Sequence, residues 1–307
     1  MTTLKMTAIR LVALLVLQTL GVELSHSAQS VSPTLNEEVS KQADIYSSRG
    51  EEVPEGYVVN RSLLSYAFSL PAEFKRSLAN LGPADRWLDI GAGEGRAVLD
   101  YCTSKHESMY LEGRARGGKK ARAVAISIED RRTSYWHETA ASLEASQIRY
   151  LFGKRLREYS LEELGRFQVI TDVLGGFSYA QYLSLFMEKA LGFLELNGSF
   201  YTLLQDVNSE DGTSRPFYPG SPFLTELADA DGSEVRVCSW LKSIACVEVA
   251  CEAKTQSSPP IEIYRIRKVC NEVKVPALVP IHFEAGTPPE RRFQLIRPLP
   301  GRASTTR

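Results

Sequence analysis

In the central part of this chain, short continuous runs of apolar residues alternate with segments in which apolar residues have helical spacing. The runs of strand length lie at 86–90, 123–128, 148–152, 167–171 and 199–204. The segments that follow them predict helices at 95–104, 131–145 and 183–194. This alternation predicts an α/β domain with a parallel sheet that helices cover on both faces.

The pattern changes on either side of this central part. Residues 61–81 have near-helical apolar spacing and predict two helices, because Pro71 interrupts the first. Beyond Gly212 three strand-like segments follow, at 235–240, 244–250 and 261–266. From about Val273 the chain is rich in Pro and Arg and predicts an irregular tail. We therefore expect four parts: an apolar segment at 1–28, a polar linker at 29–55, a domain at 56–270 and a tail at 271–307.

The strand at 86–90 runs directly into a glycine-rich turn. Asp89 and Ile90 are followed by Gly91, Gly93 and Gly95, and then by a segment that can be helical. A strand, a tight glycine turn and a helix start form a cradle for a nucleotide-like ligand at the edge of a parallel sheet. A dinucleotide fingerprint, G-x-G-x-x-G, would require glycine at position 96, where this chain has Arg. The spacing thus disfavours a nicotinamide enzyme.

The G-x-G-x-G spacing after Leu88-Asp89-Ile90 resembles the first motif of class I S-adenosylmethionine-dependent methyltransferases. The resemblance implies a doubly wound, mostly parallel seven-stranded sheet with a terminal antiparallel hairpin, and S-adenosylmethionine as cofactor. It also implies that Gly91, Gly93 and Gly95 let the backbone approach the cofactor, and that Asp89 meets its ammonium group. The alternative for Asp89 is a turn acid without a ligand.

Two more cofactor contacts are expected from the resemblance. An acid after the second strand would accept hydrogen bonds from the ribose hydroxyls; we assign it to Glu129, with Asp130 as a helix N-cap and Ser127 as the other occupant of that position. An acid after the third strand would accept from the adenine amino group. The chain has Lys154 there, which has no acceptor lone pair, so this contact departs from the family pattern.

The end of the fourth strand faces cofactor and acceptor in this family. Asp172 lies there and is either a base or orienting group, or a residue that caps the turn. Tyr66, Tyr179 and His137 are weaker candidates for an acceptor pocket. Because methyl transfer depends mainly on positioning, the acceptor, a small molecule or a protein, is left unidentified.

Charge and composition narrow the partners. The 307 residues carry a formal net charge of −1, which gives no general attraction to nucleic acid. The basic stretch at 111–122 is expected to be a solvated loop. The sequence also lacks the Asn/Asp-Pro-Pro-aromatic motif of nucleic-acid amino-methylating enzymes. With four histidines and no zinc-finger spacing of cysteines, no metal site is expected.

The N-terminus has the pattern of a secretory signal. Lys5 and Arg10 precede an apolar run at 11–22, and the small residues Ser27 and Ala28 follow. The run is too short for a stable membrane span. We expect an exported protein, with an uncleaved anchor or a cytoplasmic protein as alternatives.

Four of the five cysteines, Cys238, Cys246, Cys251 and Cys270, cluster in the last third of the chain. In an exported protein they would form one or two disulfides, and four cysteines allow three pairings. In the cytosol they would be reduced core residues. Export conflicts with a cofactor that is made in the cytosol. An exported, non-catalytic Rossmann-like binding or structural protein is therefore the alternative function.

Overall fold

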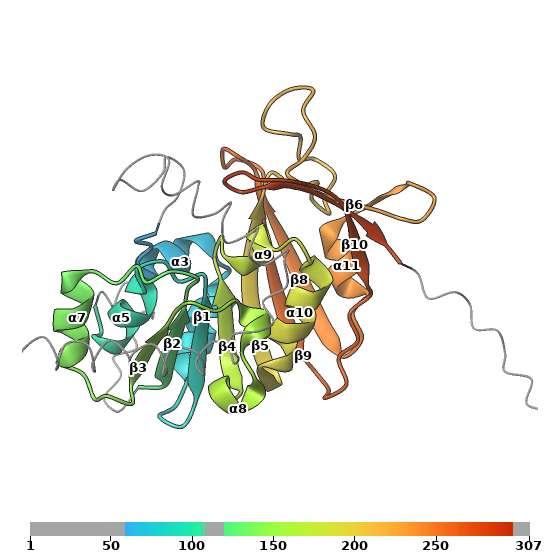
Figure 1. The fold of residues 1–307 in the computed structure, drawn as a ribbon. Coiled ribbons are helices and arrows are strands. Elements are labelled where there is room, and N and C mark those ends of the chain that lie inside the picture. Colours follow the sequence, from blue (N-terminus) through green and yellow to red (C-terminus); the bar gives the residue numbers. More distant parts are fainter. Residues whose placement is uncertain (1–58, 106, 108–119, 297–307) are drawn as a thin grey trace, which may run out of the picture. The chain divides into compact units, whose positions relative to one another are not determined.

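A computed structural model describes residues 59–105, 107 and 120–296 (Figure 1). The chain divides into two units, Met1–Glu55 and Gly56–Arg307. The expected signal segment and the linker lie outside the described residues, as do most of the basic stretch and the last residues of the tail. Within the described part of the chain, no helix has both the length and the apolar character needed to cross a bilayer.

The larger sheet of the second unit has seven strands in the order β3-β2-β1-β4-β5-β9-β8. They are β1 (Arg86–Ile90), β2 (Arg122–Ile126), β3 (Ile148–Leu151), β4 (Phe167–Asp172), β5 (Leu194–Gln205), β8 (Val247–Lys254) and β9 (Ile261–Lys268). The first five run parallel, and β9 is antiparallel to both β5 and β8. This confirms the doubly wound, mostly parallel sheet with a terminal antiparallel hairpin.

Each face of this sheet has its own hydrophobic core, because side chains alternate along buried strands. Trp87 belongs to one core and its neighbour Leu88 to the other. The Trp87 face is covered by α3 (Leu63–Ser69), α4 (Ala72–Asn80), α5 (Arg96–Cys102) and α7 (Ser134–Ala141). The Leu88 face is covered by η1 (Leu156–Glu158), α8 (Leu161–Leu164), α9 (Gly176–Tyr179), α10 (Leu183–Gly192) and α11 (Val237–Lys242).

The two helices before the sheet confirm the prediction for 61–81. The hydroxyl of Ser62 accepts a hydrogen bond from the backbone N–H of Ser65 and so caps α3. Pro71 is the N-cap of α4 and ends the preceding segment, as its missing N–H requires. These helices pack on the sheet through buried side chains, among them Tyr66, Phe74 and Leu78.

A second, four-stranded sheet was not predicted. Its order is β10-β11-β6-β7, with β6 (Thr225–Ala228), β7 (Glu234–Val235), β10 (Leu278–Glu284) and β11 (Glu290–Leu295). The irregular tail expected from about Val273 is thus wrong for most of 278–295. These residues form a hairpin whose Leu278 and Phe293 are buried in the core. The hairpin pairs with β6, about 65 residues earlier in the chain, and such non-local pairing leaves no local signal.

The strand predicted at 235–240 is also wrong, because the segment becomes helix α11 after the two residues of β7. A short apolar run does not distinguish a buried strand from a buried helix. Here Val237, Trp240 and Leu241 have the i, i+3, i+4 spacing of one helical face, and all three are buried.

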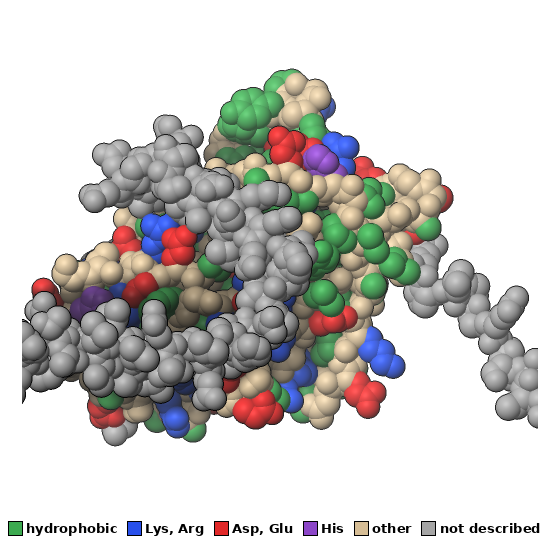
Figure 2. All heavy atoms as spheres, viewed as in Figure 1, with side chains coloured by type: hydrophobic (Ala, Val, Ile, Leu, Met, Phe, Trp, Pro, Cys, Tyr) green, Lys and Arg blue, Asp and Glu red, His purple; other side chains and the backbone are tan. Residues whose placement is uncertain are grey.

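Two disulfides join elements at this end of the sheet. Cys238–Cys251 links α11 to β8, and Cys246–Cys270 links the segment before β8 to the segment after β9. Cys102 is buried and forms no disulfide. On the face shown in Figure 2, hydrophobic side chains gather over α10, α11 and β10, and charged side chains of both signs are interspersed elsewhere.

Candidate functional site

The glycine turn lies where the order of the strands reverses. The chain passes from β1 outward to β2 and β3, and then returns to β4 on the other side of β1. In open α/β sheets, ligands bind at such a switch point, beyond the carboxyl ends of the strands. The turns after β1 and β4 touch there: a Cβ on Gly91 would lie 2.5 Å from the Cα of Gly175. The fold therefore places the turn at the edge where a ligand is expected.

All three glycines of the turn have left-handed backbone conformations, with φ of +66° at Gly91, +55° at Gly93 and +71° at Gly95. Side chains rarely adopt this conformation. The turn is also closely packed by the chain itself. A Cβ on Gly93 would lie closer than 3.0 Å to the carbonyl oxygen of Val59, which accepts a hydrogen bond of 2.7 Å from the N–H of Glu94.

Asp89 is fully buried on the face of the sheet covered by α3. Its carboxylate accepts hydrogen bonds from the hydroxyl of Tyr66 at 3.1 Å and from that of Thr171 at 2.7 Å. The Thr171 oxygen in turn accepts from the indole N–H of Trp87 at 2.8 Å. Burial raises the pKa of Asp89 to about 7, although the two hydrogen bonds oppose this rise.

Asp172 follows Thr171 in β4 and is fully buried on the opposite face of the sheet from Asp89. Its two oxygens accept hydrogen bonds of 3.0 Å from the backbone N–H groups of Gly175 and Phe177, at the start of α9. Burial raises the pKa of Asp172 to about 7. These contacts match the turn-capping alternative, and a catalytic role for Asp172 stays a prediction.

The predicted ribose acid lies beyond β2. Glu129 is half-buried and forms an ion pair with Arg131. Asp130 accepts from the guanidinium of Arg132 at 2.8 and 2.7 Å. Ser127 is the residue that directly follows the strand. Glu129 therefore lies three residues beyond Ile126, the last residue of β2, and its contact with a ribose stays a prediction.

An aromatic wall that sequence reasoning missed lies beside the glycine turn. The hydroxyl of Tyr150 donates to the carbonyl oxygen of Gly93, and a Cβ on Gly95 would lie 2.9 Å from both the Tyr150 ring and Trp136 Nε1. The guanidinium of Arg132 lies 5.3–5.4 Å from the rings of Trp136, Tyr150 and Phe152. In the sheet, Tyr150 is paired with Ala125, which is paired with Asp89, so the three residues lie in one row across the strands. The alternation of side chains along the strand predicted at 148–152 was the sequence signal that could have placed Tyr150 on this face.

One buried donor in this wall lacks a partner. The indole N–H of Trp136 makes no hydrogen bond to any described residue, although the side chain is only 7% exposed. Buried donors are nearly always satisfied, so this N–H beside Gly95 is suited to an acceptor on a bound ligand. Lys154 is directed elsewhere, because its ammonium donates to Glu163 at 2.6 Å.

The weaker acceptor candidates are not brought together as a group. Tyr66 is buried and bonded to Asp89. His137 is exposed on α7, where its ring lies 5.7 Å from that of Trp136. Tyr179 lies in α9, after the turn that Asp172 caps.

Comparisons with known proteins bear on the fold alone. No protein-family profile matches the chain, and no curated protein matches it. Among solved structures, similarity is found to a Listeria monocytogenes protein proposed to be a class I S-adenosylmethionine-dependent methyltransferase, with 14% identity and a TM-score of 0.44, over 85% of this chain and 76% of that one.

Two other solved structures are similar at a lower level. N-methyltransferase NodS from Bradyrhizobium japonicum, solved with S-adenosyl-L-homocysteine, is 12% identical over 73% of this chain and 98% of its own, with a TM-score of 0.37. YjhP from E. coli is 14% identical with a TM-score of 0.34; the match covers 54% of this chain and 56% of YjhP. By its own strand order, its antiparallel β9 and the glycine turn after β1, this chain has the fold of class I S-adenosylmethionine-dependent methyltransferases.

Proposed function

We propose that this protein binds S-adenosylmethionine at the glycine turn and transfers its methyl group to an acceptor that is a small molecule or a protein. The observation that carries the proposal is the position of the G-x-G-x-G turn at the switch point between β1 and β4. Bound S-adenosylmethionine would supply the chemistry as an electrophilic methyl group on a sulfonium. The chain itself needs only to bind and orient the reactants and to exclude water.

Each residue of the site has a definite task in this proposal. Gly91, Gly93 and Gly95 allow the left-handed backbone of the turn, and the edge of this turn would receive the ligand. Asp89, whose carboxylate is held by Tyr66 and Thr171, is the acid that would meet the ammonium group of the ligand. The free indole N–H of Trp136 would donate to a hydroxyl or carboxylate of the ligand.

Two features count against a standard version of this site. Ser127 rather than an acid follows β2, and Glu129 is engaged by Arg131. The N–H of Glu94 is already bonded to Val59. Binding therefore requires either that Glu129 exchanges its partner or that hydroxyl groups replace the usual carboxylate. The proposed affinity is correspondingly modest.

Export is proposed as the second part of this function. The two disulfides are typical of an oxidising compartment and agree with the signal-like N-terminus, which itself lies outside the described residues. The cofactor would then be bound before export, or be met outside the cytosol.

Isothermal titration of the full chain with S-adenosylmethionine tests the proposal. We expect saturable binding, and we expect Gly93→Asp to abolish it, because a side chain at Gly93 meets the Val59 backbone. Gly153→Asp is the matched control, since Gly153 also has a positive φ but no atom within 4 Å of its Cβ position. Absence of binding at about 1 mM ligand, an affinity near −4 kcal/mol, would contradict the proposal and favour a non-catalytic Rossmann-like protein.

A further inference from the structure

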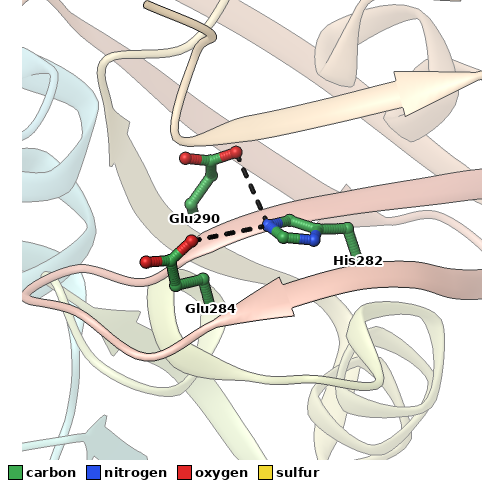
Figure 3. Close-up of side chains that lie close together, drawn as sticks. All are labelled: His282, Glu284 and Glu290. Carbon is green, nitrogen blue, oxygen red and sulfur yellow. Dashed lines mark ion pairs between the residues drawn. The ribbon is translucent and has the colours of Figure 1, made fainter.

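We propose that the outer face of the β10–β11 hairpin binds a divalent transition-metal ion, with zinc as the reference ion, through His282, Glu284 and Glu290. The hairpin belongs to the second sheet and none of the three residues belongs to the glycine turn, so this proposal does not rest on methyl transfer. Figure 3 shows the three side chains pointing toward one another, two from β10 and one from β11.

The register of the hairpin brings these residues together. His282 and Glu284 are two residues apart on β10 and so lie on one face of the sheet. Glu290 pairs directly with Glu284 across the strands. Their nearest ligand atoms all lie within 4.8 Å of one another. The number of histidines and the spacing of cysteines predict no metal site. The three residues of this candidate site are instead brought together by cross-strand pairing, which neither of those sequence features reflects.

The distances between the three side chains fit ligation of one shared ion better than direct hydrogen bonds between them. His282 Nε2 lies 3.6 Å from an oxygen of Glu290 and 3.9 Å from an oxygen of Glu284. Both distances exceed the limit of a good hydrogen bond. Zinc binds imidazole nitrogen and carboxylate oxygen at about 2.0–2.2 Å, so tetrahedral ligands of one zinc ion lie roughly 3.4 Å apart. A small movement of these side chains would therefore complete a three-ligand site with one position open to solvent.

The charge of this face is the second argument. Two carboxylates directly opposite on neighbouring strands repel each other. Arg292, which pairs with His282 in register, is the cation beside them, and it contacts Glu290 at 3.3 Å and Glu226 at 2.9 Å. Three carboxylates thus face one guanidinium and a histidine that is a metal ligand only when neutral. The net charge of about −2 matches a divalent cation.

The hairpin is held firmly enough to present such a site. Arg291, between Glu290 and Arg292, points to the opposite face and is fully buried. Its guanidinium donates to the carbonyl oxygens of Phe177 at 3.0 Å and Ala180 at 2.9 Å. The backbone that carries Glu290 is therefore fixed, and only side chains need to move when the ion binds.

The test uses the full chain after removal of metal with a chelator. Zinc is titrated in competition with a chromophoric chelator, and cobalt(II) is added separately to record its visible absorption. We expect one high-affinity equivalent per chain. His282→Ala, Glu284→Gln and Glu290→Gln should each weaken binding at least about tenfold. Arg292→Gln should strengthen binding, because it removes the competing cation.

Matched controls separate this site from adventitious binding. His137→Ala and Glu248→Gln change an exposed histidine and an exposed acid elsewhere, and both should leave the zinc affinity unchanged. Circular dichroism of each variant checks folding, and Arg292→Gln gives a change in the opposite direction that misfolding would not produce. No binding at about 1 mM zinc, or binding that His282→Ala leaves intact, would overturn the proposal.

Discussion

Two aspartates at neighbouring strand ends dominate the site at the residue scale. Asp89 and Asp172 are fully buried, and no ion pair to a cation is found for either within the described residues. Hydrogen bonds from Tyr66 and Thr171 stabilise one, and backbone N–H groups stabilise the other. Burial outweighs these bonds, and the pKa of each carboxyl rises to about 7. The site thus holds two acids that change charge near neutral pH.

The raised pKa of Asp89 predicts how stability depends on pH. Unfolded aspartate ionises near pH 3.8, whereas the folded carboxyl keeps its proton up to about pH 7. The unfolded state therefore binds fewer protons in this range, and the free energy of unfolding falls as pH rises from about 4 to 7. Asp89→Asn should remove part of this fall, on the order of 2 kcal/mol, in urea unfolding at several pH values. Glu188→Gln, an exposed acid, is the control and should keep the wild-type slope. An unchanged slope in Asp89→Asn would mean that Asp89 is ionised when folded.

The packing of the glycine turn gives a second prediction at this scale. Gly93→Ala adds a methyl group that meets the Val59 backbone at a positive φ. We expect a loss of about 3 kcal/mol of stability, the sum of backbone strain and the clash. Gly153→Ala has the same kind of φ and open space, and should lose only about 1 kcal/mol. Chemical denaturation of both variants measures the difference. Equal losses would show that strain alone matters and that Val59 does not cover the turn.

At the scale of elements, β11 is anchored to helix α9, which follows the turn that Asp172 caps. Arg291 extends from β11 into the core, where it bonds to the carbonyl oxygens of Phe177 and Ala180 and to the hydroxyl of Thr225. Ser184 adds a second link, since its hydroxyl accepts from the N–H of Leu278 at 3.2 Å. The second sheet therefore supports helices α9 and α10 from outside the main sheet.

Removal of this anchor should destabilise the protein. Arg291→Met keeps the length of the side chain but leaves two buried carbonyl groups and Thr225 without their donor, which should cost about 3 kcal/mol. Arg292→Met, one residue on and on the open face, should cost less than about 1 kcal/mol. Differential scanning calorimetry compares the two. A similar shift in both variants would contradict an anchoring role.

At the scale of the whole molecule, two disulfides fix the end of the main sheet beside the second sheet. Cys246 and Cys270, which are separated by 24 positions in the sequence, close a loop that contains β8 and β9. The double variant Cys246→Ser with Cys270→Ser should lose about 3 kcal/mol in urea unfolding, because the unfolded chain regains freedom. Treatment of the wild type with a thiol reductant should reproduce or exceed this loss. No effect of reduction would indicate that the cysteines are thiols and would remove one argument for export.

The sequence by itself determined the main sheet and the place of the glycine turn within it. The five apolar runs of the central part and the G-x-G-x-G spacing are local signals, and they correspond to strands β1 to β5 and to the turn after β1. The candidate residues Asp89, Gly91, Gly93 and Gly95 could be named because they lie close together in the chain, and their contact with a ligand stays a prediction.

Only the tertiary structure decided what surrounds them. Tyr66 and Thr171 bond to Asp89 from other elements, and Tyr150 bonds to Gly93. The hairpin at 278–295 pairs with β6, which lies far from it in the sequence. Cross-strand register likewise joined Glu284 to Glu290 and the cysteines into pairs. These contacts depend on which strands become neighbours, and a local pattern of residues cannot specify that, because side-chain packing and burial across the whole domain determine it.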